Sequence, residues 1–289
     1  DAQRPATTRT VARGLRRLSH PLRRGGESVL LAVDIGNTQT HLGVFDRGEL
    51  AHEWRASTDA RRTADELALL FGGFLSSADL SFSKQITGVV ISSVVPRSTQ
   101  ELRLMTLNYF GFAPVVVEPG TKTGIAILTD NPKEVGADRI TNAVAAHHLF
   151  GSQAVVIVDF GTAITVDAVS AAGVYLGGAI ATGVDTSATA LFSATAQITR
   201  VELKAPPSVI GKTTVTSVQA GLMYGTAALV DGLVGAVIEE LGGDARVIAT
   251  GGLAGAVSGY CTSIEKIEPI LTLTGLRLIY ERNSAHIDD

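Results

Sequence analysis

Two Asp-x-Gly loops, at residues 34–36 and 159–161, each follow a short run of apolar residues. A carboxylate at the end of a buried strand can hold a hard cation, directly or through water. The glycine two positions later lets the backbone approach a phosphate with its N–H groups directed at it. Asn37 and Thr38 in one loop and Thr162 in the other add further donors. Two such loops facing each other predict a site for the β- and γ-phosphates of a nucleotide and its metal ion.

A single Asp-x-Gly segment is weak support for such a site, because the same pattern occurs in ordinary turns. It is the paired copies in a repeated context that favour phosphate binding. The chain has no G-x-x-x-x-G-K-[ST] loop and no well-placed G-x-G-x-x-G, so the two nucleotide folds that carry them do not compete. Gly251 and Gly252 follow a third apolar run. They either let an adenosine ring lie against the backbone or form a plain strand-to-helix turn.

The segment Asn-Pro-Lys-Glu-Val-Gly-Ala-Asp-Arg at residues 131–139 lies between the two loops. Its glycine, Gly136, permits close approach of a ligand. Asp138 stands at a predicted helix start, where its carboxylate could take a proton from an attacking hydroxyl. Arg139 could pair with a substrate carboxylate through two parallel hydrogen bonds. The alternative is a helix-capping aspartate beside a surface arginine; the position between the phosphate loops favours the functional interpretation.

Three other polar positions stay open. Lys212, in a Gly-Lys-Thr-Thr segment, lies either near the site or in solvent. His41 follows the first loop and either touches phosphate or is a solvated strand residue. His147 and His148 are expected on a helix surface, and no spacing among the six histidines is typical of a metal site.

The elements that would position these groups repeat along the chain. An apolar run at 29–33 and segments at 41–46 and 50–55 predict three strands with the first loop between the first two. An apolar run at 154–158 and segments at 163–169 and 175–180 predict the same. An offset of 125 residues (159 − 34) superimposes the two loops. The same offset places Gly36 on Gly161, Thr40 on Thr165 and Val44 on Val169.

Further strands are predicted at 86–94, 113–117 and 246–250, and helices at 63–75, 98–110, 136–150, 215–241 and 271–281. Thr63 and Glu66 predict a capping box at the first of these helices. The pattern predicts an α/β protein with two mixed-sheet domains, residues 29–152 and 153–289, around an ATP cleft.

Composition excludes several classes of protein. The formal net charge is −4, and residues 1–28 hold seven Arg against Asp1 and Glu27, so this head carries +5 and the remainder −9. An acidic body argues against a nucleic-acid surface. No apolar run approaches the roughly 18 residues of a membrane span. Cys261 is the single cysteine, which is typical of a reducing cytoplasm. The basic head is expected to be a disordered extension, with a transit peptide as the alternative.

These motifs together resemble the type III pantothenate kinases of bacteria. The resemblance rests on D-I-G-N-T at 34–38, N-P-K-E-V-G-A-D-R at 131–139, D-F-G-T-A at 159–163, V-I-G-K-T-T-V at 209–215 and G-L-R-L-I-Y-E-R-N at 275–283. It runs from about residue 30 to 283 and leaves out the basic head.

The resemblance implies a duplicated actin/hexokinase-like (ribonuclease H-like) fold. It implies transfer of the γ-phosphate of ATP to the primary hydroxyl of pantothenate, which gives 4'-phosphopantothenate in the first step of coenzyme A biosynthesis. It also implies a cytoplasmic homodimer, a monovalent cation (K⁺ or NH₄⁺), and Mg²⁺ bound with ATP.

The same resemblance assigns roles residue by residue. The ATP-binding residues would be Asp34, Ile35, Gly36, Asn37, Thr38, Gln39, Thr40, His41 and Thr162. The pantothenate-binding residues would be Gly136, Ala137, Asp138, Arg139 and, from the partner subunit, Thr214. Asp138 would be the general base and Asp159 would hold the monovalent cation.

The chain departs from the family pattern at three places. Thr129 stands where some members have tyrosine, which puts the shape of the acceptor pocket in question. Residues 164–167 read I-T-V-D where many members have T-T-F-D, which changes packing behind the second loop. Thr213 replaces a usual asparagine. Two alternatives to the kinase stay open: a non-catalytic regulatory paralogue, and an actin-fold kinase or phosphatase with another small acceptor.

Overall fold

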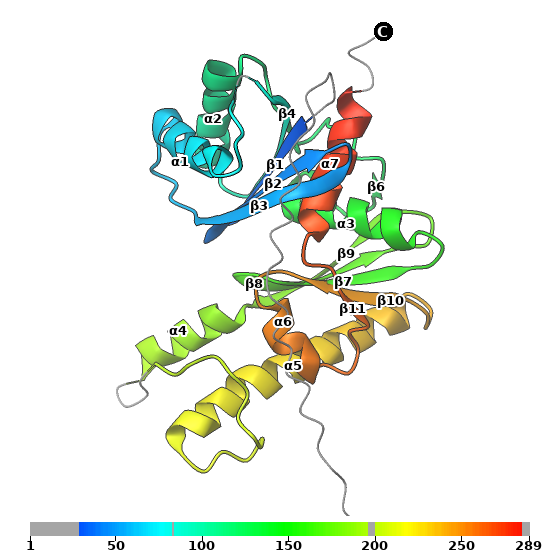
Figure 1. The fold of residues 1–289 in the computed structure, drawn as a ribbon. Coiled ribbons are helices and arrows are strands. Elements are labelled where there is room, and N and C mark those ends of the chain that lie inside the picture. Colours follow the sequence, from blue (N-terminus) through cyan, green and yellow to red (C-terminus); the bar gives the residue numbers. More distant parts are fainter. Residues whose placement is uncertain (1–28, 83, 196–199, 285–289) are drawn as a thin grey trace, which may run out of the picture.

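The computed structural model describes residues 29–82, 84–195 and 200–284. The basic head at 1–28, and with it the predicted disordered extension or transit peptide, lies outside these residues. Two sheets dominate the fold, one above the other in Figure 1, with helices between them and on both outer faces.

The first sheet has the strand order β3-β2-β1-β4-β5. β1, β2 and β3 form an antiparallel meander, whereas β4 runs parallel to β1. The β-branched and apolar residues of β1 and β4 are buried on both faces, as central strands require. The strands are β1 (Val29–Ile35), β2 (Gln39–Asp46), β3 (Glu49–Ser57), β4 (Ile86–Ser93) and β5 (Val115–Val116).

The second sheet repeats this plan with the order β11-β10-β7-β8-β9-β6. β7, β8 and β9 are antiparallel neighbours, and β10 runs parallel to β7. Its strands are β6 (Ala126–Ile127), β7 (Val155–Phe160), β8 (Ala163–Val169), β9 (Val174–Thr182), β10 (Arg246–Thr250) and β11 (Lys266–Ile267). The predicted duplication is therefore present as a repeated sheet topology.

The register corrects the predicted alignment of the repeats. Asp34 pairs with His41 in the first sheet, whereas Asp159 pairs with Thr165 in the second. The first loop is therefore one residue longer than the second, and a constant offset of 125 fails beyond the loops. His41, and not Thr40, is the structural counterpart of Thr165, because strand register follows backbone pairing and not linear spacing.

Two helices cross between the sheets, α3 (Ala137–Phe150) and α7 (Leu271–Ser284) (Figure 1). Val144 of α3 packs toward the first sheet, and its Ala143, Ala145 and Ala146 pack against the second. The helices approach closely at Gly275, where an added Cβ would lie 2.0 Å from the carbonyl oxygen of Thr141. Both sheets thus share one central helical layer.

The outer helices cover the remaining faces. α1 (Ala64–Ser76) and α2 (Pro96–Met105), which continues as a π-helical turn at Thr106–Phe110, cover the first sheet. α4 (Val184–Ala194), α5 (Thr214–Glu240) and α6 (Ala254–Val257) cover the second.

The sequence did not predict α4, α6, β6 or β11. Two elements pack on the sheet of the other half of the chain: β6, which precedes residue 152, pairs with β9, and α7, which follows residue 152, packs on β1 and β4. The domain boundary at 152/153 stays a prediction.

One expectation about membranes needs correction. Among the described residues, α5 is long and apolar enough to cross a membrane by length and composition, with 28% of the relevant window buried. The prediction missed it because threonine, serine and glycine interrupt its apolar residues without adding charge. One side of the helix, including Val218, Leu222 and Val230, packs in the core of the second sheet, as one face of an amphipathic helix does.

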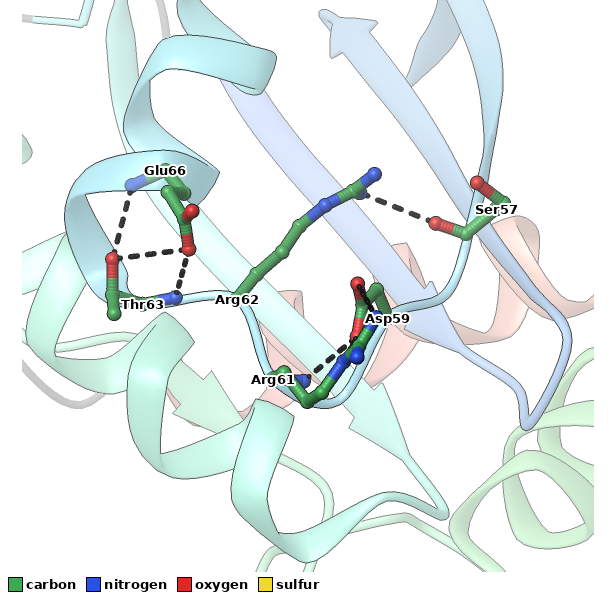
Figure 2. A network of polar contacts seen from close by, with 6 residues as sticks. All are labelled: Ser57, Asp59, Arg61, Arg62, Thr63 and Glu66. Atoms are coloured by element: carbon green, nitrogen blue, oxygen red, sulfur yellow. Dashed lines mark hydrogen bonds and ion pairs between the residues drawn. The ribbon is translucent and has the colours of Figure 1, made fainter.

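A network of polar contacts orders the segment between β3 and α1 (Figure 2). The predicted capping box is confirmed, because Thr63 accepts from the backbone N–H of Glu66 and the Glu66 carboxylate accepts from the backbone N–H of Thr63. Arg62 donates to the Ser57 carbonyl at 3.2 Å. The backbone N–H of Thr58 donates to the carbonyl of Thr38 at 3.0 Å. The loop is therefore tied to a rigid helix start.

Candidate active site

The two Asp-x-Gly loops meet. The hydroxyl oxygens of Thr38 and Thr162 lie 2.9 Å apart, although the residues belong to different sheets. Each loop is a tight turn closed by its own glycine: Gly36 N–H donates to the carbonyl of Gln39 at 2.9 Å, and Gly161 N–H to that of Ala163 at 3.0 Å. The duplicated topology thus brings the two loops face to face, as the sequence predicted.

Three carboxylates converge beside this contact. Asp34 is the penultimate residue of β1, Asp159 is the penultimate residue of β7, and Asp138 lies in the first turn of α3. Burial raises the pKa of Asp34 and of Asp159 to about 7, and the charge of Asp138 is the next contribution in both cases. The Oδ1 atom of Asp34 is buried and has no hydrogen-bond partner among the described residues. Such a group is costly unless a ligand or cation completes it.

A hydrogen-bonded chain that the sequence did not predict holds Asp159. Asn142 of α3 donates from Nδ2 to Asp159 Oδ2 at 3.0 Å, and its own Oδ1 accepts from the Thr272 hydroxyl at 2.7 Å. On the other side lies Gly251, with φ +95°, where an added Cβ would lie 2.4 Å from Asp159 Oδ1. The glycine pair after β10 therefore permits close backbone approach to this carboxylate.

Asp138 and Arg139 occupy the start of α3. Gly136 is the N-cap, and Asp138 Oδ1 accepts from the backbone N–H of Arg139 at 2.8 Å. Burial is the main cause that raises the pKa of Asp138, an effect suited to a group that must take up a proton. The Arg139 side chain is only 16% exposed and is paired with the buried Asp167. Arg139 is therefore not a surface arginine, although Asp138 does accept a backbone hydrogen bond in the first turn of the helix.

The remaining residues of the first loop divide into two groups. Asn37, Thr38 and Gln39 are exposed, whereas Ile35 and Thr40 are buried. The Thr40 hydroxyl lies 2.9 Å from that of Thr58.

His41 points into a different environment from the one proposed for phosphate. Its Nε2 lies 3.1 Å from Glu53 Oε2. Burial lowers the pKa of the imidazole, and the neighbouring Arg55 lowers it further. We therefore expect His41 to support the strand pair behind the loop and not to act as a phosphate cation.

Thr214 lies apart from this cluster, at the start of α5. Lys212, Thr213 and Thr214 are exposed and line an open groove of about 750 Å³ with Leu191 and Gly221. Figure 1 shows the first turns of α5 extending away from the second sheet. The Thr213 departure is explained here: Thr213 is the N-cap of α5 and accepts from the N–H of Thr216 at 3.2 Å, a role that Asn also fills.

The residues present fit a cation that is bound together with phosphate. Asp34 and Asp159 offer carboxylate oxygens, the ligands that hard cations prefer. Mg²⁺ usually takes one or two carboxylates together with phosphate oxygens and water. Within the described part of the chain, no group of three His, Cys, Asp or Glu side chains is close enough to hold a metal.

The carboxylates predict an unusual dependence of stability on pH. Asp34 and Asp159 have a pKa of about 7 in the folded protein, against about 4 in an unfolded chain. The folded state therefore binds more protons between about pH 4 and pH 7, so this contribution to the free energy of unfolding falls as pH rises through that window. The Asp34→Asn variant should show a smaller slope of the free energy of unfolding against pH. Its ligand-free form should be more stable than the wild type at pH 8.

Urea unfolding of the ligand-free protein at several pH values measures this slope. The exposed Asp130→Asn is the matched control and should keep the wild-type slope. An identical slope in wild type and Asp34→Asn would show that Asp34 is ionised in the folded protein throughout this range.

Comparison with known proteins agrees with this geometry. A family model described as type III pantothenate kinase matches residues 30–236. A type III pantothenate kinase of Frankia alni is 52% identical over 256 residues, which cover 88% of this chain and 100% of the relative. One of Streptomyces avermitilis is 54% identical over 262 residues, which cover 88% of this chain and 98% of the relative.

Solved structures show the same fold at low sequence identity. Component A of (R)-2-hydroxyglutaryl-CoA dehydratase from Acidaminococcus fermentans superimposes with a TM-score of 0.55 at 16% identity, covering 89% of this chain and 99% of its own. ROK hexokinase from Thermus thermophilus gives a TM-score of 0.51 at 13% identity, with the same two coverages. These likenesses confirm the predicted actin/hexokinase-like α/β fold.

Proposed function

The chain belongs to the type III pantothenate kinase family, whose members phosphorylate pantothenate in coenzyme A biosynthesis, and we propose that Asp138 is the general base of this reaction. The observation that carries the proposal is the contact between Thr38 and Thr162 at 2.9 Å. It brings the two Asp-x-Gly loops together, with the half-buried carboxylate of Asp138 close to both of their aspartates. This arrangement supports the proposal of catalysis over a binding-only paralogue, because a proton acceptor would lie beside the proposed nucleotide site.

In the proposed site the first loop binds ATP. Backbone and side-chain groups at residues 34–41, together with Thr162, orient the phosphates, with Asn37, Thr38 and Gln39 as the exposed members. Within this set, Ile35, Thr40 and His41 act from behind the loop and maintain its shape. Phosphoryl transfer depends chiefly on such positioning and on neutralising charge.

Pantothenate is proposed to bind at residues 136–139. Gly136 gives close backbone approach, and Arg139 pairs with the substrate carboxylate, since a guanidinium suits bidentate recognition of that group. Asp138 then takes the proton from the primary hydroxyl as the hydroxyl oxygen attacks the γ-phosphorus of ATP. The bond between the γ-phosphorus and the bridging oxygen breaks, and ADP leaves. Its raised pKa, caused mainly by burial, makes it a better proton acceptor than an exposed aspartate.

Two cations complete the proposal. Asp34 would hold Mg²⁺ with the ATP phosphates, and Asp159, oriented by Asn142, would hold a potassium or ammonium ion. When bound, these ions neutralise the negative charge of the phosphates. They would also lower the pKa of the carboxylates that hold them, because a nearby positive charge favours the ionised form.

We further propose a cytoplasmic homodimer in which Thr214 reaches the partner's pantothenate. Two features support this: Thr214 lies outside its own cluster, and large apolar side chains near it are exposed. Those side chains are Val209 (66% exposed), Ile210 (80%) and Val215 (47%). Light scattering that finds an active monomer would contradict the dimer.

An ADP-release assay with ATP, Mg²⁺ and pantothenate tests the proposed reaction. Turnover should require pantothenate and be higher in potassium or ammonium chloride than in sodium chloride at equal ionic strength. The Asp159→Asn variant should lose this cation dependence, because the amide carries no charge. No turnover from folded, ATP-binding protein under all cation conditions would favour the regulatory paralogue; turnover with a different acceptor would favour the other kinase alternative.

A further inference from the structure

We infer that Asp167 is a positioning residue that orients Arg139 toward the carboxylate of the substrate. Asp167 lies on β8 and is fully buried, with 0% of its surface exposed. A charged side chain in this position is costly unless it is fully paired. The inference rests on the proposed function, in which Arg139 binds the pantothenate carboxylate.

Both oxygens of Asp167 are engaged. Oδ1 accepts from Arg139 Nε at 2.8 Å, and Arg139 Nη2 lies 2.6 Å from the same atom. Tyr175 on β9 also donates its hydroxyl to Oδ1, at 2.7 Å, and Thr165 donates to Oδ2 at 2.9 Å. The carboxylate is therefore fixed by neighbours on two strands before it meets the arginine.

Arg139 is restrained from a second side. Its guanidinium carbon lies 5.8 Å from the centre of the Tyr175 ring, within range of a cation–π contact. β9 can come this close because Gly178 has no side chain: an added Cβ there would lie 2.1 Å from the carbonyl of Val166. The edge of the guanidinium that carries Nε and Nη2 therefore faces Asp167.

The other edge remains for a ligand. A guanidinium has five N–H donors in a rigid plane. Nε donates to Asp167, whereas Nη2 is paired with Asp167 only by charge, at 2.6 Å, and is buried without a hydrogen-bond partner among the described residues. Among the described residues, no hydrogen bond engages Nη1. Because the plane is rigid, holding one edge fixes the direction of the other. A preorganised arginine loses less conformational entropy on binding a carboxylate than a mobile one does.

Asp167→Asn tests this role, since it conserves shape but removes the charge and one acceptor site. We expect the KM for pantothenate to rise about tenfold, as for loss of roughly one charge-assisted hydrogen bond, with the KM for ATP unchanged and kcat within about threefold. The second probe is pantothenol, in which a hydroxymethyl group replaces the carboxylate. Its inhibition constant against pantothenate should be the same in variant and wild type.

Two further variants separate positioning from stability. Tyr175→Phe removes one donor to Asp167 and should raise the same KM about threefold, which gives the same readout if Asp167→Asn does not fold. Glu118→Gln removes the exposed pair with Arg103, 2.7 Å long, and should leave every constant unchanged.

The outcomes are distinguishable. A wild-type protein that does not phosphorylate pantothenate overturns the proposed function itself. An active wild type whose Asp167→Asn and Tyr175→Phe variants keep the wild-type KM for pantothenate overturns the role of Asp167. The role of Asp167 is also overturned if the Asp167→Asn variant raises the KM values for ATP and pantothenate together. It is overturned as well if the inhibition constant of pantothenol rises in this variant as much as the KM for pantothenate does.

Discussion

The Asp138→Asn variant is expected to lose about three orders of magnitude in kcat for pantothenate phosphorylation, since general-base catalysis contributes roughly 10²–10⁴. Asparagine keeps the size of the side chain but cannot take the hydroxyl proton. ATP binding should persist or strengthen, because the charge of Asp138 disfavours the ionised forms of Asp34 and Asp159. Steady-state kinetics give the first quantity, and calorimetric titration with ATP gives the second.

Asp65→Asn is a closely matched control. Asp65 is the second residue of α1 after an alanine, as Asp138 is in α3, but it is exposed and accepts from the Tyr109 hydroxyl at 2.8 Å. Both substitutions remove a carboxylate from the first turn of a helix, where it interacts with the helix dipole. Asp65→Asn should therefore retain activity. A loss of less than tenfold in Asp138→Asn would assign proton transfer to another group.

Gly251→Ala is expected to reduce kcat/KM at least a hundredfold, because displacing a catalytic group by about 1 Å costs roughly that factor. The added Cβ would lie 2.4 Å from Asp159 Oδ1 and 2.6 Å from the backbone nitrogen of Phe160. Both are too close for a carbon atom, so either Asp159 or the β7 end must move. Kinetics with varied potassium concentration measure the effect, which should include weaker activation by the cation.

The Gly242→Ala variant separates the effect of backbone strain at a positive φ from the effect of displacing Asp159 or the end of β7. Gly242 has the same φ of +95°, yet an added Cβ would meet nothing within 4 Å. Both variants pay the cost of a left-handed alanine, about 1–2 kcal/mol, but only Gly251→Ala crowds the site. Equal activity in the two variants would mean that close approach at Gly251 does not position Asp159.

Local patterns predicted most of the elements. The meander strands, the helices α1, α3, α5 and α7 and the capping box at Thr63 follow from apolar periodicity and short-range hydrogen bonding. α4 was missed because its segment, Val184–Ala194, is rich in Ser, Thr and Ala and has no strong apolar stripe. β6 and β11 were missed because two-residue strands are defined by their partners and not by their own residues.

In the candidate site, too, local patterns predicted some residues and missed others. The two loops and the Asp138–Arg139 pair carry recognisable motifs, and the structure gathers them. Asn142 and Asp167 carry no such signal, because a polar residue within an apolar helix or strand looks the same whether it is exposed, capped or paired. Their importance follows only from partners far along the chain, such as Thr272 and Tyr175.

By itself, the sequence determined that the chain is a duplicated α/β protein with two Asp-x-Gly loops, because spacing, glycine and β-branched runs are local properties that no partner can change. The tertiary structure alone decided the register of the repeat, the meeting of Thr38 with Thr162 and the pairing of Arg139 with Asp167. These features depend on which strands pair and which faces are buried. Burial makes an unpaired carboxylate costly in free energy, so a buried carboxylate must be matched by particular partners.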